Sequence, residues 1–126
     1  MGLVIVPYYA SLLALLFVLL SVNVIRARRL HKVASGVAGN SDLERPVRVQ
    51  ANFAEYVPFA LLLLAMAEIR GAPPLLLHPL CACLLLGRIA HAWGVSRPDE
   101  DFRFRVAGMG APFTAIAGAA LPLLLG

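Results

Sequence analysis

Three polar side chains recur at helical spacing within a stretch of the chain that is otherwise mostly apolar. Arg48, Asn52 and Glu55 follow one another at intervals of four and three residues, so on an α-helix they fall within roughly 60° of each other on one face. A charged group inside a bilayer segment costs about 2.5 kcal/mol or more unless it is paired or lines a wet cavity. We therefore expect this face to meet protein rather than lipid, either as a structural polar seam between helices or as a ligand site.

The composition indicates the setting of this polar face. Of the 126 residues, 60% are hydrophobic and only 14% are charged, and the mean hydropathy of +0.82 lies well outside the range of soluble globular proteins. A helix needs roughly 20 residues to span a hydrocarbon core of about 30 Å. The chain has room for about four such helices with short loops. The sequence therefore predicts an all-α, integral membrane four-helix bundle in a single domain, residues 1–126.

Turn signals place the boundaries between these helices. Clusters of glycine, proline and polar residues separate the apolar segments, and Ser41 or Asp42 is expected to cap the second helix. In the last helix, Gly110, Thr114 and Gly118 recur at intervals of four, a pattern that lets helices approach closely in lipid. The predicted helices span about residues 3–32, 43–69, 75–95 and 102–125.

Other residues of chemical interest are interpreted more simply. Cys81 and Cys83 would point about 160° apart on a helix, so they can neither form a disulfide nor chelate together. His91 has no second ligand at chelating spacing on its helix, so we predict no metal site. Glu68 is interpreted as an interfacial charge, and His78 is assigned no role.

The distribution of basic residues predicts the topology. Every Lys and Arg except Arg70 lies at or near the first and third connections, and positive charge gathers on the cytoplasmic side of membrane proteins. Both termini are therefore expected outside the cytoplasm. Some of these residues are attributed to this general charge excess alone: Arg26, Lys32, Arg45 and Arg97.

The remaining polar residues lie deeper in the helices and favour a binding site. Arg48, Arg88 and Glu55 would come together near the cytoplasmic face. Arginine holds carboxylates in bidentate fashion, and a glutamate can hold an ammonium group. This combination suits a small polyanionic cytosolic ligand that also carries an amino group. Nothing resembles a phosphate loop, and no feature favours a nucleic-acid partner.

The stretch from Arg48 to Pro58 resembles the signature of a known family. Its pattern is close to R-x-x-x-N-x-x-E-x-x-P, the signature of the MAPEG family, the membrane-associated proteins in eicosanoid and glutathione metabolism. Arg28 and Arg29 are similar to a basic pair at the end of the first helix in one eukaryotic member, and the segment from Gly87 to His91 is similar to part of another. The segment from Gly87 to Met109 looks most like bacterial members, which implies a bacterial inner membrane.

The resemblance implies a homotrimer that binds glutathione as a co-substrate between adjacent subunits, near the cytoplasmic face. An arginine near the start of the fourth helix, Arg105 or Arg103, would stabilise the glutathione thiolate and lower its pKa for attack on a hydrophobic electrophile. Arg105 is favoured because it lies deeper. Carried over position by position, the residues that would bind glutathione are Arg28, Arg29, Arg48, Gln50, Asn52, Glu55, Tyr56, Arg88 and His91.

The sequence leaves more than one function open. The first is a membrane-bound glutathione transferase, with lipid hydroperoxide reduction as a further activity; the second is a non-catalytic membrane protein of the same fold that binds a lipid-like molecule or a partner. A structural or transport-related bundle without glutathione is a third. Val95 replaces a tyrosine of the eukaryotic enzymes, which weakens the case for eicosanoid chemistry. Retention of Arg48, Asn52 and Glu55 favours the transferase.

Overall fold

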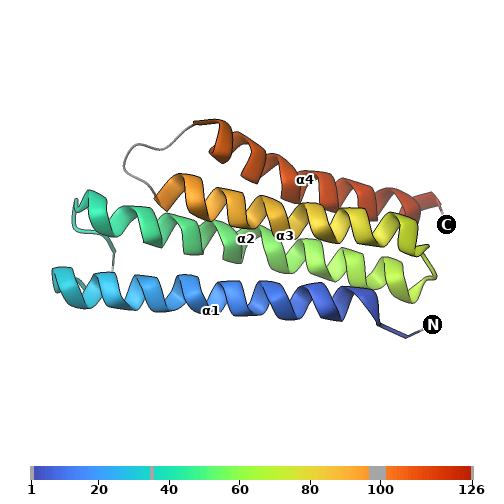
Figure 1. The fold of residues 1–126 in the computed structure, drawn as a ribbon, viewed down its shortest axis with the longest axis horizontal. Helices are drawn as coiled ribbons and strands as arrows, with labels where there is room; N and C mark the ends of the chain where they lie inside the picture. Colours follow the sequence, from blue (N-terminus) through green and yellow to red (C-terminus); the bar gives the residue numbers. More distant parts are fainter. Residues whose placement is uncertain (1, 35, 97–101, 126) are drawn as a thin grey trace.

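The protein folds into four antiparallel helices. The computed structural model describes residues 2–34, 36–96 and 102–125, without the side chains of 41, 94–96 and 102–109. The connection between the first two helices lies at one end of the bundle, and the first helix begins where the last one ends, at the other (Figure 1). The predicted all-α, four-helix architecture is confirmed. The helices are α1 (Ile5–His31), α2 (Ser41–Ile69), α3 (Pro74–Ser96) and α4 (Phe102–Leu125).

The start of α2 differs from the sequence-based prediction. The cap is Asn40, whose side-chain oxygen accepts hydrogen bonds from the backbone N–H groups of Asp42 at 2.9 Å and Leu43 at 3.2 Å. The prediction of Ser41 or Asp42 as the cap was wrong, because Asn40 lies immediately before them and its side-chain amide oxygen can accept these hydrogen bonds.

Helices α2 and α3 form the centre of the bundle. Helices α2 and α3 contact each other, and each of them also contacts α1 and α4. In the part of the chain that the structure describes, α1 and α4 make no contact with one another. The buried core therefore lies along α2 and α3, with α1 and α4 on opposite sides (Figure 1). Its largest fully buried aliphatic side chains are Leu13, Leu43, Leu64, Leu77 and Leu84.

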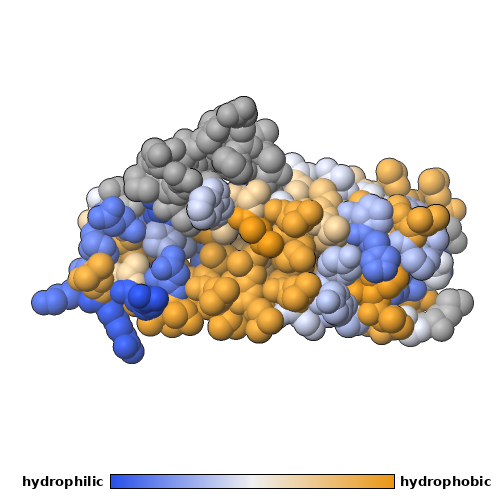
Figure 2. Space-filling model, viewed as in Figure 1, coloured by the Kyte–Doolittle hydropathy of each residue, from blue (hydrophilic) through white to orange (hydrophobic). Residues whose placement is uncertain are grey.

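The outer surface is that of a membrane protein. Three helical segments, Ile5–His31, Asp42–Ile69 and Pro74–Trp93, are long and apolar enough to cross a bilayer, and the described part of α4, Gly110–Leu125, is a shorter apolar helix. A belt of hydrophobic side chains covers the middle of the visible face, and hydrophilic side chains cover the end near the α1–α2 connection (Figure 2). Apolar exposure of this extent is stable only in lipid or against another protein.

Gly118 marks a close approach between α3 and α4. A Cβ atom at Gly118 would lie 2.6 Å from Leu80 Cδ2, whereas one at Gly110 would meet nothing within 4 Å. Of these two glycines in the small-residue stripe, only Gly118 is therefore placed where the two helices of the same chain pack closely.

Glu68 ties the end of α2 to the beginning of α1. Its side chain is only 7% exposed, and its carboxylate accepts hydrogen bonds from the backbone N–H groups of Ile5 at 2.7 Å and Val6 at 2.9 Å. The first N–H groups of a helix have no partner within the helix, and a negative charge complements the helix dipole there. The interpretation of Glu68 as an interfacial charge was wrong, since it caps α1 from a neighbouring helix.

Candidate functional site

The predicted polar stripe of α2 exists, but it points out of the bundle. Arg48 and Glu55 are exposed, whereas Val49 and Phe53 on the other side of the helix are buried. The Arg48 side chain is 58% exposed and forms an ion pair with Glu44 at 3.3 Å, one turn earlier. Exposed pairs of this kind contribute at most about 1 kcal/mol. Arg48 and Glu55 are therefore available to a partner outside this chain. We define these two residues, together with the neighbouring Asn52 and Tyr56, as the outward stripe.

Glu55 is exposed at a depth that corresponds to the hydrocarbon core of the bilayer. Glu55 lies within the membrane-spanning segment Asp42–Ile69, about 21 Å along the helix from Ile69 at 1.5 Å per residue. A hydrocarbon core about 30 Å thick that begins near Ile69 would therefore include this carboxylate. Because an ionised carboxylate facing lipid is costly, this face must be covered by another protein surface or open to water.

Tyr56 connects the outward stripe to α4. Its ring packs edge to face against Phe113, with 5.5 Å between ring centroids, and both Tyr56 and Asn52 are half-buried. The stripe thus lies beside the contact between α2 and α4. Arg103 and Arg105 belong to the first turns of α4, but their side chains lie outside the described residues.

Three other predicted ligands of glutathione lie away from the outward stripe. Arg28 donates hydrogen bonds from Nη1 to the carbonyl oxygens of Gly36 at 2.7 Å and Val33 at 3.4 Å, so it braces the α1–α2 loop. Gln50 donates from Nε2 to Ser21 Oγ at 2.9 Å and joins α2 to α1. Arg29 is exposed on α1 and lines a separate pocket described below.

Arg88 and His91 are buried in the core. They are 1% and 4% exposed, and Arg88 Nη2 lies 3.4 Å from His91 Nδ1. The guanidinium carbon lies 5.7 Å from the centroid of the Phe53 ring, a cation–π arrangement. Phe53 is turned about 140° from Arg48 around α2. Arg88 therefore packs against the buried face of α2, on which Phe53 lies, and not beside the exposed Arg48.

The Arg88 guanidinium is incompletely satisfied within the bundle. Among the residues that the structure describes, its Nε and Nη1 atoms have no hydrogen-bond partner. A buried cation with unpaired donors costs free energy, and contact with an aromatic ring offsets only part of that cost.

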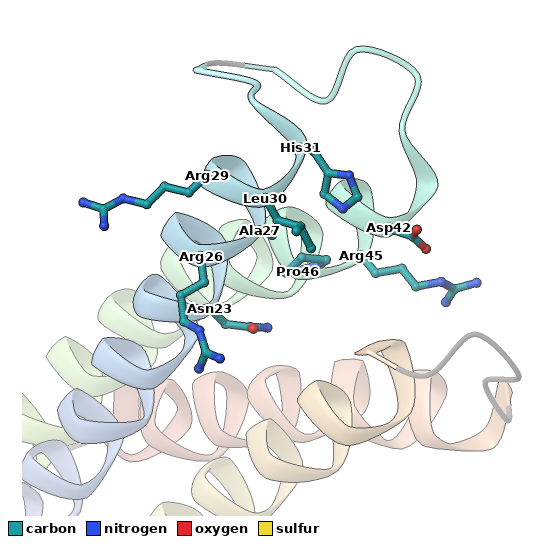
Figure 3. A pocket seen from close by; sticks show the side chains of 9 residues that line it. All are labelled: Asn23, Arg26, Ala27, Arg29, Leu30, His31, Asp42, Arg45 and Pro46. Carbon is teal, nitrogen blue, oxygen red and sulfur yellow. The ribbon is translucent and has the colours of Figure 1, made fainter.

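A polar pocket lies between the facing ends of α1 and α2. Its volume is about 740 Å³, and Figure 3 shows it from close by. The sequence analysis attributed Arg26 and Arg45 to the general charge excess, but both line this pocket. The spacing of Asn23 and Arg26, three residues apart on α1, could have indicated a shared face. The lining residues are Asn23, Arg26, Ala27, Arg29, Leu30, His31, Asp42, Arg45 and Pro46.

An apolar groove of about 240 Å³ lies farther along the same two helices. It is bounded on the α2 side by Phe53, Val57 and Pro58, and on the α1 side by Leu13 and Phe17. Ala54 also lines it, directly before Glu55 in the sequence. An apolar ligand in this groove would therefore lie at about the same depth as the outward stripe.

Comparison with known proteins assigns the family. The MAPEG family model matches residues 6–125, and the chain therefore belongs to the MAPEG family. It is 37% identical over 108 residues to the inner membrane protein YecN of Escherichia coli (strain K12), which covers 86% of this chain and 81% of that protein. It is also 35% identical over 116 residues to the uncharacterized protein sll1147 of Synechocystis, which covers 90% and 84% of the two chains.

Proposed function

We propose that this protein is a membrane-bound glutathione transferase of a bacterial inner membrane. The observation that carries the proposal is the exposure of Glu55 on a membrane-spanning helix, beside Arg48 on the same face. Such a face needs a polar ligand, a protein partner or both. In a homotrimer, a neighbouring subunit would cover the outward stripe and enclose glutathione against it. The YecN relative is an inner membrane protein by name, and the excess of basic residues at this end favours the cytoplasmic side.

The chemistry of the outward stripe fits glutathione. This peptide carries two carboxylates and one ammonium group besides its thiol. Arg48 can bind a carboxylate through two parallel hydrogen bonds, and Glu55 can accept hydrogen bonds from the ammonium group. The Asn52 amide and the Tyr56 hydroxyl supply neutral donors and acceptors for the peptide groups. The proposed ligands are therefore Arg48, Asn52, Glu55 and Tyr56, with Arg105 or Arg103 near the thiol.

The proposed reaction is a nucleophilic attack by sulfur. An arginine at the start of α4 stabilises the thiolate after its proton has passed to water. The sulfur then forms a C–S bond with an electrophilic carbon, and the displaced electron pair leaves with the departing group or is protonated. The apolar groove beside Phe53 and Pro58 can hold the hydrophobic part of the electrophile. With a lipid hydroperoxide, two glutathione molecules would yield the disulfide, an alcohol and water.

Thiolate absorbance in the ultraviolet tests this proposal. Purified protein in detergent is mixed with glutathione at neutral pH, alongside Arg48→Ala, Glu55→Ala and Arg105→Ala. We expect one thiolate for each bound glutathione in the native protein, and less in each variant. Arg70→Ala, an exposed arginine at the opposite end, is the matched control and should leave the signal unchanged. Absence of thiolate at saturating glutathione would contradict the transferase mechanism.

The apolar groove also supports a second function, binding of a lipid-like molecule without catalysis. Its walls are almost entirely hydrocarbon, which suits an acyl chain as well as an electrophile. This alternative predicts saturable displacement of a fluorescent fatty acid without thiolate formation or turnover. Ala54→Trp would fill the groove and should abolish that displacement, and a groove that binds no hydrophobic probe would exclude the alternative.

A further inference from the structure

We propose that the polar pocket between α1 and α2 binds a phosphate-bearing anion, such as the headgroup of an acidic phospholipid. The inference is based on Arg26 and Arg45, and neither residue belongs to the proposed glutathione ligands or to the apolar groove. The proposed function therefore does not require anion binding in this pocket.

The lining of the pocket combines basic and apolar residues. Three arginines and one carboxylate, that of Asp42, are among its lining residues, together with Ala27, Leu30 and Pro46. In Figure 3, Arg26 lies on α1 and Arg45 on α2, on either side of the lining residues Leu30 and Pro46, and the guanidinium groups of Arg26, Arg29 and Arg45 point in different directions. A negatively charged group that enters the pocket can therefore be approached by cations from two helices.

Neutral donors add to this positive field. The Asn23 side chain lies on the α1 wall between the two helices (Figure 3). His31 is held in place because its Nδ1 atom lies 2.9 Å from Asn40 Nδ2, at the cap of α2. The pocket is thus built on two connected helix ends, and its volume of about 740 Å³ leaves room for a headgroup and not only for a water molecule.

The position of the pocket favours phosphate over other anions. The pocket lies at the hydrophilic end of the bundle, next to the apolar belt, where phospholipid phosphates gather (Figure 2). Guanidinium groups match the geometry of phosphate oxygens. Basic pockets between helices on the cytoplasmic side commonly bind acidic lipid headgroups. A soluble phosphate compound shares the same recognition chemistry, so the experiment must separate these two sources.

Native mass spectrometry and thermal unfolding, both in neutral detergent, test the site. The probes are phosphatidylglycerol, phosphatidylcholine and inorganic phosphate, each titrated separately. We expect phosphatidylglycerol to remain bound and to raise the unfolding midpoint more than phosphatidylcholine does. The double variant Arg26→Gln and Arg45→Gln should weaken its apparent affinity about 25-fold, from about fivefold for each arginine. Arg70→Gln, outside the pocket, is the matched control and should retain full affinity.

The other outcomes decide the proposal. A midpoint shift produced equally by inorganic phosphate and lost in the double variant supports the site and identifies a soluble ligand. Equal phosphatidylglycerol affinity in the native protein and the double variant overturns the proposal, as does equal weakening by Arg70→Gln. If the double variant does not fold, the single variant Arg26→Gln replaces it, because the Arg26 side chain is exposed and has no packing role. The thiolate signal with glutathione should persist in either variant.

Discussion

Two glutamates on the same helix have opposite surroundings. Glu68 is buried and accepts hydrogen bonds from two backbone N–H groups of α1, at Ile5 and Val6. Glu55, about three and a half turns earlier, is exposed on the outer face of α2. One carboxylate completes the fold of its own chain, and the other is placed for a partner. The charge of a residue in a membrane helix is thus no guide to its role until its surroundings are known.

The same contrast extends to the two ends of the bundle. At the end with Glu68, polar groups find partners within the chain, as in the pairing of the Tyr9 hydroxyl with His78 Nδ1 at 3.0 Å. At the opposite end, Arg29 and Arg48 are exposed, and a pocket opens between α1 and α2. We therefore expect substitutions at the first end to change stability and those at the second end to change binding.

Replacement of Glu68 should have the largest effect. Glu68→Ala removes both acceptors and leaves two N–H groups of α1 without their partners, so the free energy of unfolding should fall by about 3 kcal/mol. Chemical denaturation in mixed micelles measures the change. Glu68→Gln keeps one carbonyl acceptor and should lose about half as much. A loss under about 1 kcal/mol for Glu68→Ala would remove the structural role assigned to this carboxylate.

Replacement of Glu55 should instead weaken ligand binding. Glu55→Ala leaves the proposed ammonium group of glutathione without its acceptor, which should cost about 2 kcal/mol of binding free energy or more, roughly thirtyfold in Kd. Isothermal titration with glutathione measures the loss. The matched control is Asp42→Ala, which removes another exposed carboxylate from α2 at a residue that lines the separate pocket between α1 and α2. Equal weakening by the two substitutions would indicate a general charge effect and not a specific contact.

Substitution of Gly118 probes the packing of the end that contains Glu68. Gly118→Val introduces a Cβ atom 2.6 Å from the present position of Leu80 Cδ2, so Leu80 must move and the free energy of unfolding should fall by about 1.5 kcal/mol. The same substitution at Gly110, where nothing lies within 4 Å, is the control. Thermal unfolding of the two variants gives the comparison. Equal unfolding midpoints would show that the stability of the protein does not depend on this contact between α3 and α4.

The smallest effect should come from Gln50. Its side chain bonds to Ser21 Oγ at 2.9 Å, and hydrogen bonds between membrane helices contribute about 0.6 kcal/mol on average. A double-mutant cycle with Gln50→Ala and Ser21→Ala should therefore yield a coupling energy near that value. Glutathione affinity should remain unchanged in Gln50→Ala. A clear loss of affinity would return Gln50 to the glutathione site, as the resemblance to the family had implied.

Local patterns allowed much of the fold to be predicted. The apolar segments specify four helices because their lengths and turn residues are local properties. The shared orientation of Arg48 and Glu55 follows from the helical period alone, and both side chains are indeed exposed on one side of α2. The period does not say whether that face meets the same chain, however. The sequence analysis left a seam within the bundle open, and the structure places the face outside it.

Contacts between distant residues could not be predicted from local patterns. The partners of Glu68 lie 62 and 63 residues earlier in the chain, so no periodicity connects them. Arg28 was predicted as a ligand from the resemblance to the family, and local patterns did not show that the loop brings the Gly36 carbonyl to it. The pocket near Arg26 and Arg45 likewise depends on the meeting of two helix ends.

The capping of α1 by Glu68 has a consequence for the order of events during synthesis. The helix that needs the cap leaves the ribosome first, and the carboxylate that supplies it is made 62 residues after Val6. Before the α1–α2 hairpin has formed, the first amides of α1 lack this partner. The N-terminal backbone of α1 thus depends on a single side chain that the next helix supplies.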